Sequence, residues 1–144
     1  MAEMIQADWA KIGVKAKIVT YEWGEYIKRS KGGEHDAMLI GWSGDNGDPD
    51  NWLATLFGCK AIGGNNFSRW CYQPFEDLVV KAKRVTDQGE RTKLYEEAQV
   101  IFKEQAPWAT LAHSTQFVPM SAKVSGFTMS PLGDFTFENV DIAE

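Results

Sequence analysis

The sequence predicts an α/β fold in which helices flank a mixed sheet. Residues 14–21, VKAKIVTY, alternate apolar and polar side chains, as a strand with one exposed face does. Residues 37–42, AMLIGW, are apolar almost throughout, which is typical of a strand covered on both faces. Apolar residues at helical spacing between 75 and 102 predict two further helices. With 144 residues, the chain is expected to form one domain.

Two shorter helices are expected in the first third of the chain. The first contains apolar residues at helical spacing and stops at Gly13, because glycine commonly ends a helix. The second begins near Trp23 and ends at Gly32 and Gly33. Since it lies between the two expected strands, we expect a βαβ unit with parallel strands and a right-handed crossover. The apolar residues of the first helix are Met1, Met4, Ile5, Trp9 and Ile12.

The second half of the chain is expected to begin with a helical pair. Pro74 starts one helix, and DQGE at 87–90 has the form of a capping box that opens the next. A tight turn between them makes the helices antiparallel, so that they pack as a layer on the sheet. Residues 108–113 and 116–120 are then expected as strands.

Composition and charge exclude several classes of function. The chain has 20 acidic and 15 basic residues and a formal charge of −5, and its basic clusters are no longer than a Lys-Arg pair. A nucleic-acid partner is therefore not expected. No apolar run approaches the roughly 20 residues of a membrane-spanning helix, and the N-terminal residues lack the pattern of a signal peptide. The chain as given is expected to be neither anchored nor visibly exported.

The segment 41–52, GWSGDNGDPDNW, is the strongest candidate for a site. It follows the expected strand 37–42 at its carboxyl end, where open α/β sheets usually bind ligands. An EF-hand reading from Asp45 fails, because Asp50 occupies the place where that calcium loop requires glycine. Asp48 precedes Pro49 as an N-cap precedes the first residue of a helix, so Asp48 and Asp50 are interpreted as structural. Asp45 is not needed by that cap and stays a candidate ligand group.

Catalysis has weaker support in the sequence. No G-x-S-x-G motif surrounds Ser114 or any other serine, so His113 beside it does not indicate a hydrolase. A small metal-dependent hydrolase that uses Asp45, Asp48 and Asp50 remains the alternative from the enzyme class. A third alternative is an interaction module whose apolar C-terminal segment recruits a partner strand.

The two cysteines leave two interpretations open. Cys59 and Cys71 enclose a short loop rich in glycine and asparagine, as expected of a loop closed by a disulfide, and unrelated free thiols are equally compatible with the spacing. A metal site is less favoured, since His35 and His113 follow no zinc spacing. No metal and no cofactor are predicted.

Four segments together resemble one family. They are GWSGDNGDPDNWLATLF, NNFSRWCYQPFEDLVVKA, the helix end EQAPW and the closing PLGDFTFENV. They resemble the periplasmic dipeptide-binding receptors of bacterial ABC importers, within the peptide- and nickel-binding solute receptor family. The resemblance implies that the chain corresponds to the C-terminal portion of a two-lobed receptor. Residues 1–123 would form part of the second lobe, and residues 124–144 would cross back to the missing first lobe.

The resemblance also implies roles for particular residues. Asp45 matches the aspartate that pairs with the α-amino group of a bound dipeptide, and Trp42, Ser43 and Gly44 match the adjoining strand end. Cys59 and Cys71 match a pair that is disulfide-bonded in the dipeptide receptor. The implied partners are a dipeptide or short peptide, the ABC importer permease and the missing N-terminal lobe, in the periplasm and without enzymatic activity. The arginine that would hold the ligand carboxylate has no counterpart here.

The C-terminal segment carries one more expectation. Residues 124–144 contain short apolar, strand-like pieces interrupted by Gly126, Pro131 and Gly133. Because unpaired strand edges invite the addition of another strand, we expect this segment either to be disordered or to form a strand-mediated homodimer of the fragment.

Overall fold

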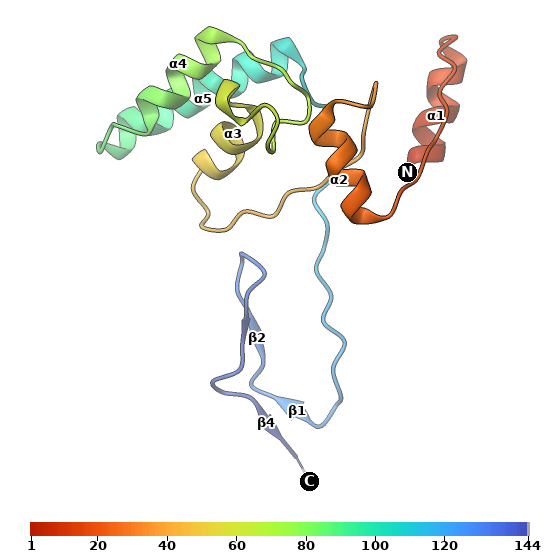
Figure 1. Cartoon of the computed structure of the whole chain (residues 1–144). Helices are drawn as coiled ribbons and strands as arrows, with labels where there is room; N and C mark the ends of the chain where they lie inside the picture. The colour runs from red at the N-terminus through yellow and green to blue at the C-terminus, as the bar shows by residue number, and fades with distance from the viewer. Residues whose placement is uncertain (144) are drawn as a thin grey trace.

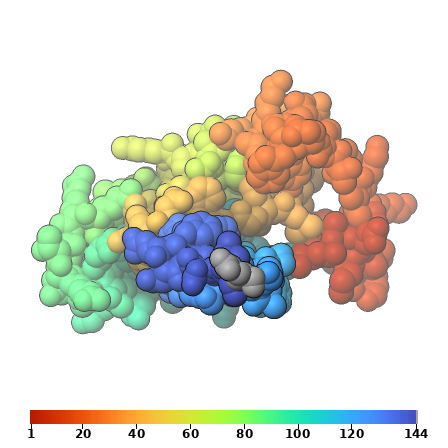
Figure 2. Space-filling view, turned by 90° about the horizontal axis from the view of Figure 1, so that it is seen from below, coloured from red at the N-terminus to blue at the C-terminus, as the bar shows by residue number. Residues whose placement is uncertain are grey.

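The structure, a computed structural model, describes residues 1–143 and has three parts (Figure 1). A helical body contains α2 to α5, α1 stands apart from it, and an extended segment leads to a tail of short strands. Seen from below, the tail lies in front of the helical body, and α1 lies at one end of the molecule (Figure 2). The helices are α1 (Ala2–Lys11), α2 (Trp23–Gly32), α3 (Asp50–Phe57), the 3₁₀ helix η1 (Cys59–Ala61), α4 (Gln73–Ala82) and α5 (Gln88–Gln105).

The hydrophobic core lies where α3, α4 and α5 meet. Phe75 and Val79 of α4 and Ala98 of α5 are at most 1% exposed. The ring of Phe57 at the end of α3 packs against Phe102, with ring centres 4.6 Å apart. Burial of a large apolar side chain contributes about 1.5–3 kcal/mol, so these helices form the most strongly stabilised part of the chain. The core residues are Leu53, Leu56, Phe57, Phe75, Val79, Ala82, Leu94, Tyr95 and Ala98.

The predicted pair of helices is confirmed, but it packs on a different partner. The carboxylate of Asp87 accepts a hydrogen bond of 2.7 Å from the backbone N–H of Glu90 and so caps α5. The two helices lie side by side and enclose most of the core (Figure 1). They cover α3 and not a sheet, so the predicted layer of helices on a sheet is wrong for the described residues.

Both shorter helices end where the sequence predicts. Gly13 follows α1 with φ +84° and Gly33 follows α2 with φ +78°, a conformation that glycine adopts at little cost. The start of α2 uses a cap that sequence reasoning missed. The Glu22 carboxylate accepts hydrogen bonds from the backbone N–H groups of Gly24 and Glu25, at 2.8 and 3.3 Å. These bonds lower the pKa of Glu22.

The predicted βαβ unit is wrong for this structure. Residues 14–21 and 37–42, expected as parallel strands, form no ladder with any part of residues 1–143, and neither do 108–113 and 116–120. A strand needs a neighbour for its backbone hydrogen bonds, and the described chain places none beside them. The backbone of Leu39 instead exchanges two hydrogen bonds with the hydroxyl of Tyr26, at 2.8 and 3.2 Å.

The tail pairs with itself. Strand β1 (Val124–Ser125) is antiparallel to β4 (Asp141–Ile142), and β2 (Thr128–Met129) is antiparallel to β3 (Phe135–Thr136). These small sheets and the helices confirm the predicted mixture of α and β structure. Gly126 is required between β1 and β2, because a Cβ there would lie 1.8 Å from the carbonyl oxygen of Asn139. The crossing of 124–144 to another lobe, and the expected choice between disorder and pairing with a second copy, stay predictions.

The disulfide between Cys59 and Cys71 is present, with the two Cα atoms 4.8 Å apart. It closes a loop around Asn66, which is 1% exposed. The amide nitrogen of Asn66 donates to the carbonyl oxygens of Gly58 and Trp70, at 3.1 and 2.8 Å. The bridge and this buried amide therefore both join the end of α3 to the start of α4.

We predict that replacing both Cys59 and Cys71 with serine lowers the free energy of unfolding by about 3 kcal/mol, the chain-entropy value for a loop of about a dozen residues. Urea unfolding measures the change, and reduction of the parent protein should cause a loss of the same size. Thiol titration of denatured, unreduced protein should find no free thiol. Two reactive thiols per chain would contradict the bridge.

Candidate functional site

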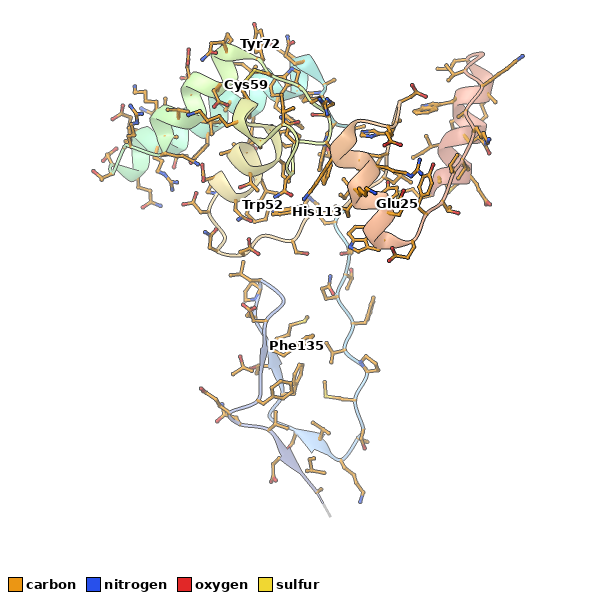
Figure 3. The ribbon with its side chains drawn as sticks, in the orientation of Figure 1. Glu25, Trp52, Cys59, Tyr72, His113 and Phe135 are labelled. Carbon is orange, nitrogen blue, oxygen red and sulfur yellow. A yellow bond between two sulfur atoms is a disulfide. The ribbon has the colours of Figure 1, made fainter. Side chains whose placement is uncertain are left out.

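The candidate site is the loop 41–52, which leads into α3. Ser43 and Asp45 are exposed, whereas Trp42 and Trp52 pack partly buried against the helical core. Figure 3 shows Trp52 on the side of α3 that faces this loop. The predicted position at the end of a parallel strand is wrong, because residues 35–47 form no ladder. The first turn of α3 holds the loop in place.

Asn51 connects the two ends of the loop by three hydrogen bonds. Its side-chain oxygen accepts one from the indole N–H of Trp42 and another from the backbone N–H of Asp45, both at 3.1 Å. Its amide nitrogen donates to Oδ2 of Asp45, also at 3.1 Å. The structure therefore brings Trp42 and Asp45, two of the predicted site residues, together on one side chain of α3.

Gly44 allows the loop to approach α3 closely. A Cβ at this position would lie 1.9 Å from Cη2 of Trp52, well inside van der Waals contact. Any larger residue would force either the indole or the loop to move. Ser43 and Asp45, on either side of Gly44, are thereby kept against the helix with their side chains exposed.

An ion pair fastens the middle of the loop to the helical pair. Arg91 of α5 donates from Nη1 and Nη2 to the two carboxylate oxygens of Asp48, at 2.7 and 2.8 Å. Its Nε donates to the carbonyl oxygen of Ala82 at 3.1 Å, and Nη2 also donates to the hydroxyl of Tyr95 at 3.0 Å. The hydrogen bonds from Arg91 lower the pKa of Asp48. Both side chains are about one-third exposed, at 28% and 32%.

Asp50 is held by a second cation. Its Oδ2 lies 3.1 Å from Nζ of Lys83, at the end of α4. Asp48 is not the N-cap of α3 that the sequence predicts, because Pro49, one residue later, occupies the cap position. Oδ1 of Asp48 still accepts a hydrogen bond of 2.9 Å from the backbone N–H of Asp50. With both carboxylates neutralised by basic side chains, only Asp45 keeps an exposed, unneutralised negative charge in this loop.

Other chemical features of residues 1–143 lie outside this loop. No group of three or more histidine, cysteine or acidic side chains in this range is arranged to hold a metal ion. None of the helices described is long and apolar enough to cross a bilayer. A hollow between the first half of α1 and residues 16–20 is lined only by residues of the N-terminal region. It does not include any residue of the candidate site.

The tip of the tail comes close to the loop. A Cβ built on Gly47 would lie 3.8 Å from Cδ2 of Leu132, in the turn between β2 and β3. This is ordinary contact distance, and Leu132 remains 40% exposed. The tail thus reaches the same side of the body as Asp45 while its strands extend away, as the position of Phe135 shows (Figure 3).

Sequence reasoning missed two residues that organise this site. Asn51 lies six positions after Asp45, and no local motif links an aspartate to an asparagine at that spacing. Arg91 lies 43 positions after its partner Asp48. Only the packing of α5 against α4, which in turn packs on α3, brings Arg91 to the loop, so the sequence contains no local signal for this contact.

The chain is similar in sequence to a known protein family and to several curated proteins. A sequence model of the bacterial extracellular solute-binding proteins, family 5 Middle, matches residues 1–64. Di/tripeptide-binding protein 1 of Pseudomonas aeruginosa is 65% identical over 144 residues, which are 100% of this chain and 27% of that protein. Heme-binding protein A of Haemophilus influenzae is 51% identical over 99% of this chain and 26% of its own length. The chain thus spans about a quarter of these relatives.

Solved structures agree with these matches. The dipeptide-binding protein of Pseudoalteromonas sp. SM9913, in complex with Met-Leu, has a TM-score of 0.88 and 38% identity, over 99% of this chain and 28% of that one. The ABC transporter-associated periplasmic binding protein DppA of Helicobacter pylori, in complex with the peptide STSA, has a TM-score of 0.87 and 42% identity, with the same coverage. The resemblance to dipeptide-binding solute receptors is confirmed.

We predict that Asp48→Asn lowers the free energy of unfolding at pH 7 by about 1–2 kcal/mol, because a bidentate, charge-assisted pair becomes a weaker neutral contact. Since the pKa of Asp48 is lowered in the folded state, its stabilisation is complete above the unfolded value of about 3.9 and is lost as the pH falls through the folded value.

Urea unfolding between pH 7 and pH 2.5 tests this prediction. Below about pH 4, the free energy of unfolding should fall less in the variant than in the parent. Asp36→Asn is the matched control, since Asp36 is exposed and forms no ion pair within the described residues. Equal acid dependence of the parent and Asp48→Asn would contradict the assignment.

Proposed function

We propose that this chain, which matches part of a bacterial extracellular solute-binding protein of family 5 in sequence and fold, is a ligand-binding segment of a periplasmic dipeptide receptor. Such a receptor would deliver peptides to an ABC importer. The observation that carries the proposal is 65% identity over the whole chain to a protein named for binding di- and tripeptides. Binding and transfer of a solute require no catalytic group of this chain.

The geometry of the loop supports an ammonium group as the ligand. Asp45 presents an exposed carboxylate whose Oδ2 and backbone N–H are both held by Asn51. The neighbouring acids Asp48 and Asp50 are already paired with Arg91 and Lys83. A carboxylate held in one orientation can select a free α-amino group by charge and by hydrogen bonds at once. Trp42, Ser43 and Gly44 would then lie beside the peptide backbone.

The same charge argues against heme as the ligand of this segment. Heme carries anionic propionate groups, which a carboxylate at the site would repel. The relative named for heme binding is 51% identical, whereas the di/tripeptide-binding relative is 65% identical. A peptide with a free amino terminus fits both the charge of Asp45 and the higher similarity.

The rest of such a receptor would supply what this segment lacks. The solved relatives are covered to only 28% of their length. We propose that residues 1–123 contribute to one lobe, that residues 124–144 cross to the other, and that closure of the lobes encloses the ligand. The transporter-associated and periplasmic description of the Helicobacter pylori structure supports the permease partner and the compartment.

We predict that the isolated 144-residue chain binds dipeptides weakly or not at all. An exposed ion pair contributes only about 0–1 kcal/mol, whereas a micromolar complex requires about 8 kcal/mol. Asp45 is exposed here, so this segment alone does not desolvate the pair. Isothermal titration calorimetry with a panel of dipeptides measures the affinity. Micromolar binding by the isolated chain would contradict the need for a second lobe.

We further predict the role of Asp45 in a chimera in which these 144 residues replace the matched segment of the Pseudomonas aeruginosa di/tripeptide-binding protein. Asp45→Asn should weaken a dipeptide with a free amino terminus by roughly 10- to 100-fold, since a charge-assisted hydrogen bond is lost. The N-acetylated dipeptide carries no ammonium and should lose little. Equal losses for the two ligands would exclude pairing of Asp45 with the amino terminus, and tight heme binding would overturn the peptide assignment.

A further inference from the structure

We propose that Asn51 is a positioning residue that sets the direction of the Asp45 carboxylate and thereby the preference for a free amino terminus. This inference rests on the proposed function and deepens it. Asn51 itself need not touch the ligand, because its three hydrogen bonds all go to residues of the loop. It would act through Asp45 and Trp42, which are held on the same side-chain amide.

The partners of Asn51 determine which way its amide faces. Two N–H donors, the indole of Trp42 and the backbone of Asp45, point at one end of the amide, which must therefore be the oxygen. A carboxylate oxygen of Asp45 faces the other end, which must be the NH₂ group. An aspartate at position 51 could accept the first two bonds but could not donate the third. The arrangement therefore requires both the acceptor and the donor of an amide.

The amide leaves one carboxylate oxygen of Asp45 available. Oδ2 accepts from Asn51, whereas Oδ1 receives no hydrogen bond from any residue in the range 1–143. Because Oδ2 and the backbone N–H of Asp45 are tied to the same side chain, rotation of the carboxylate is restricted. An ordered acceptor binds an ammonium group at a lower entropic cost than a freely rotating one. Oδ1 of this exposed residue thus remains available to accept a hydrogen bond from a ligand.

Asn51 is suited to this task because its own position is rigid. It lies in the first turn of α3, and the next residue but one, Leu53, belongs to the core. On the other side of the loop, the pair between Asp48 and Arg91 prevents the turn from moving away from α5. A side chain on a packed helix holds a binding group more precisely than one on the loop itself.

The test uses the full-length chimera described above and a dipeptide with either a free or an acetylated amino terminus. Asn51→Leu, which keeps the approximate volume and removes the three bonds, should weaken the free dipeptide by about tenfold or more and the acetylated one by less than about twofold. Asn46→Leu is the matched control. Asn46 lies in the same loop and only accepts a hydrogen bond of 3.0 Å from the backbone of Asp48. This variant should change neither affinity by more than about twofold.

A double-mutant cycle separates positioning from a general effect on the fold. In the Asp45→Asn background, Asn51→Leu should cause little further loss, because the group that it positions is gone. The indole N–H signal of Trp42 in a ¹H–¹⁵N spectrum, assigned with Trp42→Phe, should shift upfield in Asn51→Leu and stay in place in Asn46→Leu.

The possible outcomes have distinct meanings. Equal losses for the two dipeptides in Asn51→Leu, additive losses with Asp45→Asn, or an unmoved Trp42 signal would overturn the role of Asn51 while leaving Asp45 as the ligand group. If Asp45→Asn itself affects both dipeptides equally, the assignment of the amino-terminus site fails and this inference fails with it. A chimera that binds no dipeptide contradicts the proposed function and, with it, this inference.

Discussion

The ion pair between Asp48 and Arg91 is the contact on which the site depends. It joins a loop without regular structure to the longest helix of the body, and both hydrogen bonds are shorter than 2.9 Å. Bidentate pairing of a guanidinium with a carboxylate fixes orientation as well as distance. Arg91 also donates hydrogen bonds to the carbonyl oxygen of Ala82 and the hydroxyl of Tyr95. The position of the loop is therefore fixed by the packing of α4 and α5.

The three aspartates of the loop 41–52 therefore have two different roles. Asp48 and Asp50 are neutralised by Arg91 and Lys83 and secure the loop, whereas Asp45 keeps its charge at the surface. A cluster of three unneutralised acids would repel one another and would attract cations without selectivity. With two of them paired, the remaining carboxylate is a single, directed acceptor, which suits recognition of one ammonium group.

The extended segments are subject to a different physical constraint. Strands cannot form in isolation, because each backbone N–H and C=O group needs a partner. Residues 14–21 and 37–42 have the composition of strands, yet residues 1–143 provide no neighbour for them. Their apolar side chains therefore stay at the surface of the described residues, as Ile18 and Leu39, both 40% exposed, show.

The sequence by itself determined the local features of this protein. The helix ends at Gly13 and Gly33, the cap at Asp87 and the apolar faces of α4 and α5 follow from residue types at short spacing, so they were predictable. The resemblance also pointed to the loop that contains Asp45 as the candidate site, which stays a prediction. Only the tertiary structure decided how that loop is held, since Arg91 lies far along the chain from Asp48 and meets it through helix packing. It also decided that strand-like segments stay unpaired, because pairing depends on neighbours that no local pattern encodes.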